Sequence, residues 1–448
     1  VIRYGRSDGA LEARHYVDES YTPVNVPLVV AKPGTALHDA TFWQPLALDE
    51  TVAQNGLAVP GNVQTFVGAR WGYVRGFALP PSKKGVPIET GPPPIGTPRT
   101  AAYKQAAVDV IRKSAELDPA DGQTIDIGLG VRGGNPLGTS NGHGYPLNPA
   151  TGEPYAPEIV LRADYARILA EFWADGPNSE TPPGHWNVLA NEVSDSPGLA
   201  TRIGTGDANR LRWDVQLYFA LNGAAHDAAI AAWGLKRAYQ SVRPISMIRH
   251  LAGKGQSSER SLRSYDPDGL PLIPELVELV TSESSAPGER HAALADHVGE
   301  IAIRTWRGPP KDPTNESGVG WILGERWVPY QKATFVTPAF PGFVSGHSTF
   351  SRAGAEVLAA VTGSPFFPGG LFEQRFSPGY LKFEHGPSEP ITLQWATYYD
   401  ASDEAGISRL YGGIHVAADD FAGRRVGSRV GTQAWALAQR YFAGTAHR

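Results

Sequence analysis

Residues 408–421 read SRLYGGIHVAADDF and gather an arginine, two glycines, a histidine and an aspartate. Arg409 offers a planar fork of donors that suits an oxyanion. The two glycines allow the chain to turn, and His415 follows at the expected start of a helix. Asp419 stands one turn later, where its carboxylate can hold one imidazole nitrogen and leave the other as a nucleophile or ligand. Alone, this His-x-x-x-Asp spacing is a weak signal.

The composition argues against a nucleic-acid-binding, a membrane-spanning and a disulfide-bonded protein. The chain has 448 residues, a formal net charge of −5 and no cysteine. A nucleic-acid surface would need clustered Lys and Arg, so we expect no nucleic-acid partner. No apolar run approaches the roughly eighteen residues of a membrane span, so we also expect none. Disulfides and thiolate metal sites are excluded. Because the sequence begins at Val1, we expect an exported, secreted or periplasmic protein.

The chain is expected to divide into two parts. Residues 1–100 are rich in Pro and Gly, and we expect an irregular extension packed on a core, with short strands near VNVPLVV. Residues 101–448 are expected to form a mainly helical domain with short β insertions. Periodicity predicts its helices at 101–117, 159–174, 186–193, 208–232, 235–242, 288–306, 347–361, 390–405 and 414–440, and Pro244 should end the fifth of them. Residues 130–157 are expected to be a loop, and 307–344 to contain strands and turns.

A second segment, WGLKRAYQSVRP, carries two cations. Lys236 and Arg243 are seven residues apart, so a helix would place both on one face. They repel each other unless an anion lies between them or carboxylates flank them. The alternative is an ordinary solvated basic face.

A third segment, FPGFVSGHSTFSRAGAEVL, is expected to begin a helix. The free amides of the first turn favour an anion. Gly346 would let the backbone approach a ligand closely, and His347 could exchange protons with it. The alternative is that Ser345 is only an N-cap.

Taken in order, Lys-x6-Arg-Pro, Ser-Gly-His and Ser-Arg-x5-His-x3-Asp resemble the tripartite signature of the vanadium haloperoxidase and type 2 phosphatidic acid phosphatase superfamily. Val344 stands where a Pro usually precedes Ser-Gly-His, which affects local loop geometry. The resemblance implies an all-α fold built on two four-helix bundles. It also implies an insertion near the site, within 251–340, that could be a lid or a subunit contact.

The segments EFWADGPNSETPPGHWN (171–187) and DAAIAAWGLK (227–236) are similar to segments of soluble bacterial vanadium-dependent haloperoxidases. Trp233 precedes Lys236 by three residues. Phe340 precedes Ser345 by five, at a position that lines the halide side of the family's pocket. Both aromatic residues could instead be ordinary core packing.

The resemblance also implies roles within the site. His415 would coordinate vanadium, and Asp419 would orient it. The vanadate oxygens would be bound by Lys236, Arg243, Arg409, the Ser345 hydroxyl and the Gly346 amide, and phosphate can occupy the same site. Asp175 resembles a carboxylate that braces one of the arginines. The remaining histidines, His185 and His226 among them, are expected to be structural.

The implied reaction is oxidation of a halide by hydrogen peroxide to hypohalous acid, with a small organic acceptor as a further partner. His347 would take up the peroxide proton as general base, and Lys236 would polarise the peroxide. The alternative is an acid phosphatase that uses His415 as nucleophile and forms a phosphohistidine. A non-catalytic oxyanion carrier is a third reading, which His347 disfavours. The preferred halide and the oligomeric state cannot be read from the sequence.

Overall fold

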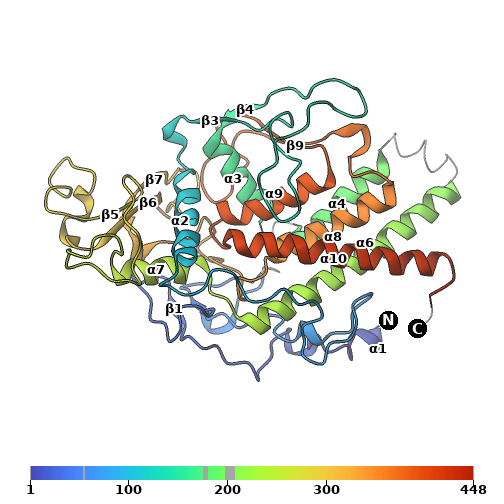
Figure 1. The fold of residues 1–448 in the computed structure, drawn as a ribbon, viewed down its shortest axis with the longest axis horizontal. Helices are drawn as coiled ribbons and strands as arrows, with labels where there is room; N and C mark the ends of the chain where they lie inside the picture. Colours follow the sequence, from blue (N-terminus) through green and yellow to red (C-terminus); the bar gives the residue numbers. More distant parts are fainter. Residues whose placement is uncertain (1, 54–55, 175–179, 197–206, 447–448) are drawn as a thin grey trace.

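The computed structural model describes residues 2–53, 56–174, 180–196 and 207–446, and most of its regular structure is helical (Figure 1). The helices are α1 (Ile2–Gly5), α2 (Ala101–Ala115), α3 (Arg162–Phe172), α4 (Thr181–Asp195), α6 (Asp207–Tyr239), α7 (Pro244–Lys254), α8 (Gly346–Thr362), α9 (Tyr398–Tyr411) and α10 (Ala417–Phe442). The short strands are β1 (Leu28–Val29), β2 (Leu46–Ala47), β3 (Thr124–Asp126), β4 (Ile159–Leu161), β5 (Val277–Leu279), β6 (Ile301–Trp306), β7 (Val319–Leu323), β8 (Phe372–Phe376) and β9 (Ile391–Trp395). This arrangement confirms the all-α class with small β insertions.

One helical bundle forms the centre of the molecule. Helices α6, α8 and α10 contact one another, α8 also contacts α4 and α9, and α10 also contacts α9 (Figure 1). Helix α3 packs on α9, and α2 contacts α7 and α9. The described helices therefore show one bundle directly, with α2, α3 and α7 around it.

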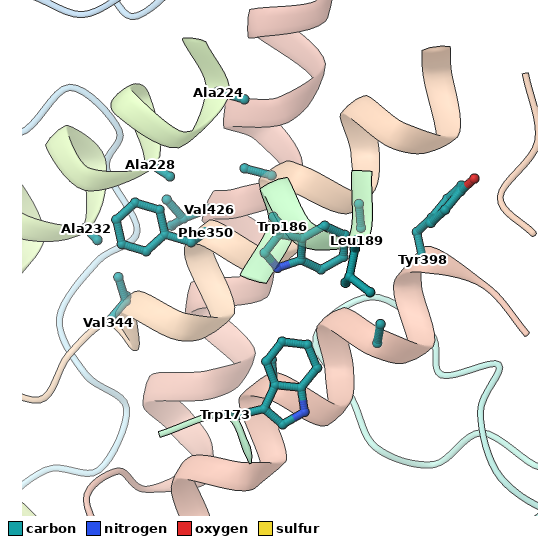
Figure 2. Packing of buried hydrophobic residues seen from close by; sticks show 14 of the residues in the cluster. Trp173, Trp186, Leu189, Ala224, Ala228, Ala232, Val344, Phe350, Tyr398 and Val426 are labelled. Carbon is teal, nitrogen blue, oxygen red and sulfur yellow. The ribbon is translucent and has the colours of Figure 1, made fainter. Parts of the chain in front are cut away.

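Small residues allow the bundle helices to approach closely. On α6, Ala224, Ala228 and Ala232 recur every fourth residue and are fully buried; in Figure 2 they lie on the side of the helix nearest Phe350 of α8. On α10, a Cβ added to any of three glycines spaced four residues apart would collide with a carbonyl oxygen of α8 or of its N-cap Ser345; these are Gly423, Gly427 and Gly431. Such close packing holds the N-terminal end of α8 firmly against the start of α10.

One expected helix is wrong and another is wrong in its first half, because strand pairing prevails there. Within 288–306, only residues 292–297 form a 3-10 helix, and 301–306 form β6, the central strand of the antiparallel sheet β5-β6-β7. The stretch IAIRTW holds β-branched residues that suit a buried strand. Within 390–405, residues 391–395 pair with β8, and α9 begins only after Thr397, whose side chain accepts from the Asp400 amide.

Other helix ends also differ from the predicted ones. Residues 159–161 are strand β4, so α3 starts three residues later than expected. The two helices predicted at 208–232 and 235–242 are the single helix α6. Pro244 does not end a helix; it is the first residue of α7, where its missing N–H costs nothing.

The first hundred residues contain short elements and contribute to the core. Their buried aromatic residues Trp43 and Phe66 belong to the main hydrophobic cluster together with residues of α6 and α8. None of the helices in the described part of the chain is long and apolar enough to cross a membrane.

Candidate functional site

The three sequence segments converge at one end of the bundle. Lys236 lies in the last turn of α6, and Arg243 immediately precedes α7. The Ser-Gly-His segment begins α8, Arg409 lies in the last turn of α9, and His415 lies between α9 and α10. All of these side chains are buried, so the alternative of a solvated basic face is wrong for Lys236 and Arg243.

Lys236 is held by backbone oxygens rather than by a carboxylate. Its Nζ donates to the carbonyl of Pro341 at 2.7 Å and to that of Gly342 at 2.9 Å. Burial lowers the pKa of Lys236 well below its usual value, and the Arg243 charge lowers it further. The protonated ammonium of Lys236 would therefore be stabilised by a neighbouring anion.

Arg243 also donates to the chain segment that holds Lys236. Its Nε donates to the Phe340 carbonyl at 2.9 Å, and its Nη1 donates to the Ile414 carbonyl at 2.7 Å. The expected shared helix face is wrong, because α6 ends at Tyr239 and Arg243 has an extended backbone. The two cations meet through tertiary structure and not through helical spacing.

His415 and Asp419 form a buried dyad. His415 Nδ1 lies 2.8 Å from Asp419 Oδ2, and His415 Nε2 lies 3.2 Å from Arg243 Nη1. A guanidinium only donates, so Nε2 accepts and the ring proton resides on Nδ1. Burial, followed by the charges of Arg243 and Lys236, lowers the pKa of His415 well below its usual value. The imidazole is therefore neutral, with its Nε2 lone pair directed into the cationic cluster.

The pKa of the Asp419 carboxylate is raised, whereas that of His415 is lowered. Burial raises the pKa of Asp419 to about 6, while Lys236 and Arg243 oppose that rise. Its backbone oxygen accepts from the Ser345 amide at 3.0 Å. Asp419 thus joins the start of α10 to the start of α8.

The start of α8 carries the Ser345 hydroxyl and the Gly346 amide, the two groups that are expected to bind an oxyanion there. Ser345 is an N-cap, as the alternative proposed, because its Oγ accepts from the Ser348 amide at 3.3 Å. Gly346 is the first helical residue, and the amides of a first turn have no partner within the helix. Burial lowers the pKa of His347 well below its usual value, and Arg409 lowers it further.

Trp173 is a site residue that the sequence did not reveal. Its carbonyl oxygen accepts from His347 Nε2 at 2.6 Å and from Arg409 Nη1 at 2.7 Å. Because Nε2 carries the proton of the neutral ring, Nδ1 is the nitrogen of His347 that can accept another. A backbone oxygen has no sequence signature; only the similarity of 171–187 to haloperoxidase segments pointed to this region.

Trp233 and Phe340 are core residues that border the cluster. Their ring centroids lie 4.7 Å apart, and both rings are buried. Lys236 Nζ lies 5.7 Å from the Trp233 centroid and 5.0 Å from that of Phe340. A Cβ on Gly346 would lie 3.4 Å from the Trp233 ring, so the pair also closes on the start of α8.

Gly412 and Gly413, which precede His415, differ in backbone conformation. Gly413 has a φ of 69° and packs on Pro329, whereas Gly412 has an ordinary helical backbone. Only the second glycine is therefore needed for the turn that brings His415 back to the site. Asp175, the expected brace for an arginine, lies outside the described residues.

Comparisons with known proteins agree with this geometry. Residues 216–270 and 289–444 match the family model described as the VCPO second helical-bundle domain. These residues therefore carry a helical-bundle domain of the VCPO type. A comparison with curated protein sequences found no match.

Two solved structures share the fold of this chain. An apo-type bacterial vanadium-dependent chloroperoxidase aligns with a TM-score of 0.64 and 17% identity, over 99% of this chain and 73% of that one. A holo-type bacterial vanadium-dependent chloroperoxidase aligns with a TM-score of 0.58 and 18% identity, over 97% and 70% of the two chains. At these identities the likeness establishes the fold.

The residues present fit the oxyanion that the family's name implies. Lys236, Arg243 and Arg409 are buried together, and Asp419 is the carboxylate in direct contact with their histidine. Within the described ranges there is no group of three or more His, Asp or Glu residues that could hold a bare metal ion. Buried cations in such excess are stabilised by an anion, and a multiply charged oxyanion provides one.

Proposed function

We propose that this chain is a vanadium-dependent haloperoxidase that oxidises a halide with hydrogen peroxide to hypohalous acid. The observation that carries the proposal is the buried cluster of Lys236, Arg243 and Arg409 around the neutral His415 at the start of α8. The membership of its second helical-bundle domain in the VCPO family supports the same reading.

Vanadate would be bound by positive charges and by hydrogen-bond donors directed at its oxygens. Lys236, Arg243 and Arg409 would neutralise the oxyanion, and the Ser345 hydroxyl and the Gly346 amide would donate to its oxygens. The Nε2 lone pair of His415 would serve as the metal ligand, with the Asp419 carboxylate fixing the tautomer. When bound, vanadate would supply a Lewis-acid centre that activates peroxide toward halide without a change of oxidation state.

His347 would accept the proton of hydrogen peroxide. Its Nε2–H is donated to the Trp173 carbonyl, which orients the ring and leaves Nδ1 to accept the proton of hydrogen peroxide. The lowered pKa of His347 keeps the ring neutral and ready to accept that proton before peroxide arrives.

The halide side would be formed by Trp233 and Phe340. These rings exclude water beside Lys236, and a halide that approaches over them would be attracted by the cationic cluster. Lys236 would remain the group that polarises peroxide, because its ammonium is fixed by two carbonyl oxygens.

One experiment separates this function from the acid phosphatase that the same residues could support. The chain is incubated with orthovanadate and assayed with hydrogen peroxide, bromide and a dye that changes colour on bromination. A parallel sample receives p-nitrophenyl phosphate and no vanadate. We expect vanadate-dependent bromination that is lost in His415→Ala and kept in His226→Ala, an exposed histidine away from the site.

Release of p-nitrophenol that vanadate inhibits, with no bromination, would instead identify a phosphatase. His347→Ala separates the enzyme from an oxyanion carrier. This variant should bind vanadate and lose bromination, whereas a carrier would show no bromination even in the wild-type chain.

A further inference from the structure

A second feature of the molecule is a cavity of about 680 Å³ beside the oxyanion site. Its walls come from the end of α3, one face of α4, strand β8, and the segments around residues 331–335 and 380–383. A cavity of this volume accommodates a small organic molecule.

Aromatic rings form a continuous part of the cavity wall. Phe172 lies 5.2 Å from Phe376 between ring centroids, and Phe376 lies 4.8 Å from Tyr380. Trp173, Phe335 and Phe383 also line the cavity, together with charged residues such as Glu171, Lys332 and Arg375. Flat rings on several sides favour a flat, apolar occupant, because ring faces and edges pack well against one another.

One face of α4 points into the cavity. His185, Val188, Leu189 and Glu192 line it, and their spacing of three, four and seven residues places them on a single side of the helix. His185 and Leu189 are buried at the floor, while Val188 and Glu192 are exposed at the rim. The cavity thus runs from the surface to a buried histidine.

His185 is a polar group that lies beside two aromatic rings of the cavity wall. Its ring lies 5.2 Å from Phe172 and 5.0 Å from Trp173 between centroids, and its Nε2 lies 3.3 Å from a carboxylate oxygen of Glu180. Burial lowers the pKa of His185, although Glu180 partly offsets this. A neutral imidazole has one donor and one acceptor, which suits a hydroxyl group.

Two residues connect the cavity to the oxyanion site or to the turn that precedes His415. Trp173 lines the cavity, and its carbonyl accepts from His347 and Arg409. Gln331 also lines it, and its Nε2 donates to the Gly412 carbonyl at 3.3 Å. A molecule in the cavity would therefore lie against Trp173, whose carbonyl holds two residues of the oxyanion site.

We propose that this cavity binds a hydroxylated aromatic molecule, with its hydroxyl at His185 and Glu180, and presents it to hypohalous acid. The inference rests on the proposed function, which supplies the hypohalous acid. In the step, a ring C–H bond and the halogen–oxygen bond break and a carbon–halogen bond forms. The ring proton combines with the departing hydroxide to give water, so the products are the halogenated aromatic and water. His185, expected from the sequence to be structural, becomes a residue that positions the acceptor.

The test uses direct binding of 2-naphthol to the full chain, measured by calorimetry without peroxide. Val188→Trp places an indole at the rim of the cavity and should weaken binding about tenfold or more. Val215→Trp introduces the same change at an exposed position of α6 that does not line the cavity, and should change nothing. Equal affinities in the two variants would overturn the site.

The role of the histidine is tested by comparing 2-naphthol with naphthalene, which lacks the hydroxyl. The wild-type chain should prefer 2-naphthol by about five- to tenfold, as one hydrogen bond provides. His185→Phe keeps an aromatic ring and should abolish this preference while retaining naphthalene binding. A preference that survives in His185→Phe would overturn the assignment of the hydroxyl to His185.

Bromide oxidation by the wild-type chain is measured separately, as tribromide formed without any organic acceptor. Bromide oxidation without 2-naphthol binding would overturn the acceptor site alone. Binding of 2-naphthol without bromide oxidation would overturn the proposed function, and with it the role of the cavity as an acceptor site.

Discussion

His415 Nδ1 lies 2.8 Å from Asp419 Oδ2, and both side chains are buried where α10 begins. This contact fixes the proton on Nδ1 and turns Nε2 toward Arg243. The arrangement gives the histidine the tautomer that a metal ligand needs, and it does so through a single pair of residues four positions apart.

Replacing the carboxylate by an amide tests the dyad. In Asp419→Asn the charge is lost and the amide can offer either a donor or an acceptor to Nδ1, so the imidazole is held less well. We expect vanadate affinity to fall about 10- to 100-fold, the range found when a partner of a metal-bound histidine is lost. Calorimetric titration with vanadate measures it, and Asp109→Asn, at a solvent-accessible position on α2, is the control. Unchanged affinity in Asp419→Asn would show that the carboxylate does not orient His415.

The turn before His415 offers a matched pair of glycine substitutions. Gly413 has a φ of 69°, and a Cβ there would lie 2.9 Å from the Pro329 Cβ. Gly412 has a helical backbone, and a Cβ there would meet mainly the movable Gln331 amide. We expect Gly413→Ala to lower the melting temperature and vanadate affinity together, and Gly412→Ala to have a much smaller effect. Equal effects of the two substitutions would contradict this account of the turn.

Glu171 makes stability depend on pH. Its carboxylate accepts from the amides of Lys382 and Phe383 and from the Tyr330 hydroxyl, yet burial raises its pKa to about 7. The unfolded chain releases this proton near pH 4.5, while the folded chain keeps it until about pH 7. The stability contributed by the protonated group is therefore complete below pH 4.5 and lost as pH rises to 7, by about 3 kcal/mol.

The matching measurement compares the wild-type chain with Glu171→Gln, which cannot titrate at this position. Thermal unfolding is followed from pH 4 to pH 8. The stability of the wild type relative to the variant should decrease across that interval and level off above pH 7. A difference that stays constant from pH 4 to pH 8 would contradict the raised pKa.

Much of the site could be predicted because its residues carry distinctive chemistry in a fixed order. Lys236, Arg243, Arg409 and His415 were expected to meet around an oxyanion, and the structure brings them together. The expected reason for the first pair was wrong, however, because Arg243 lies outside α6. The order of these residues in the sequence was enough to predict which residues form the site. Their geometry depends on tertiary packing, which the sequence pattern does not show.

The parts that could not be predicted depend on the backbone or on distant pairing. The carbonyls of Trp173, Pro341 and Gly342 hold three site residues, but any residue type has a carbonyl oxygen. Strand β6 was expected to be helical because its partners β5 and β7 are separated from it in sequence. The cavity beside Trp173 likewise draws its walls from segments far apart in the chain.

The central claim is that His415 and the surrounding cations hold vanadate. The most direct test is vanadium-51 nuclear magnetic resonance of orthovanadate titrated with the full chain, with His415→Ala and His226→Ala alongside. We predict a signal from bound vanadate that saturates at one equivalent in the wild type and in His226→Ala, and that is absent in His415→Ala. Saturable binding that persists at the same affinity in His415→Ala would contradict the account.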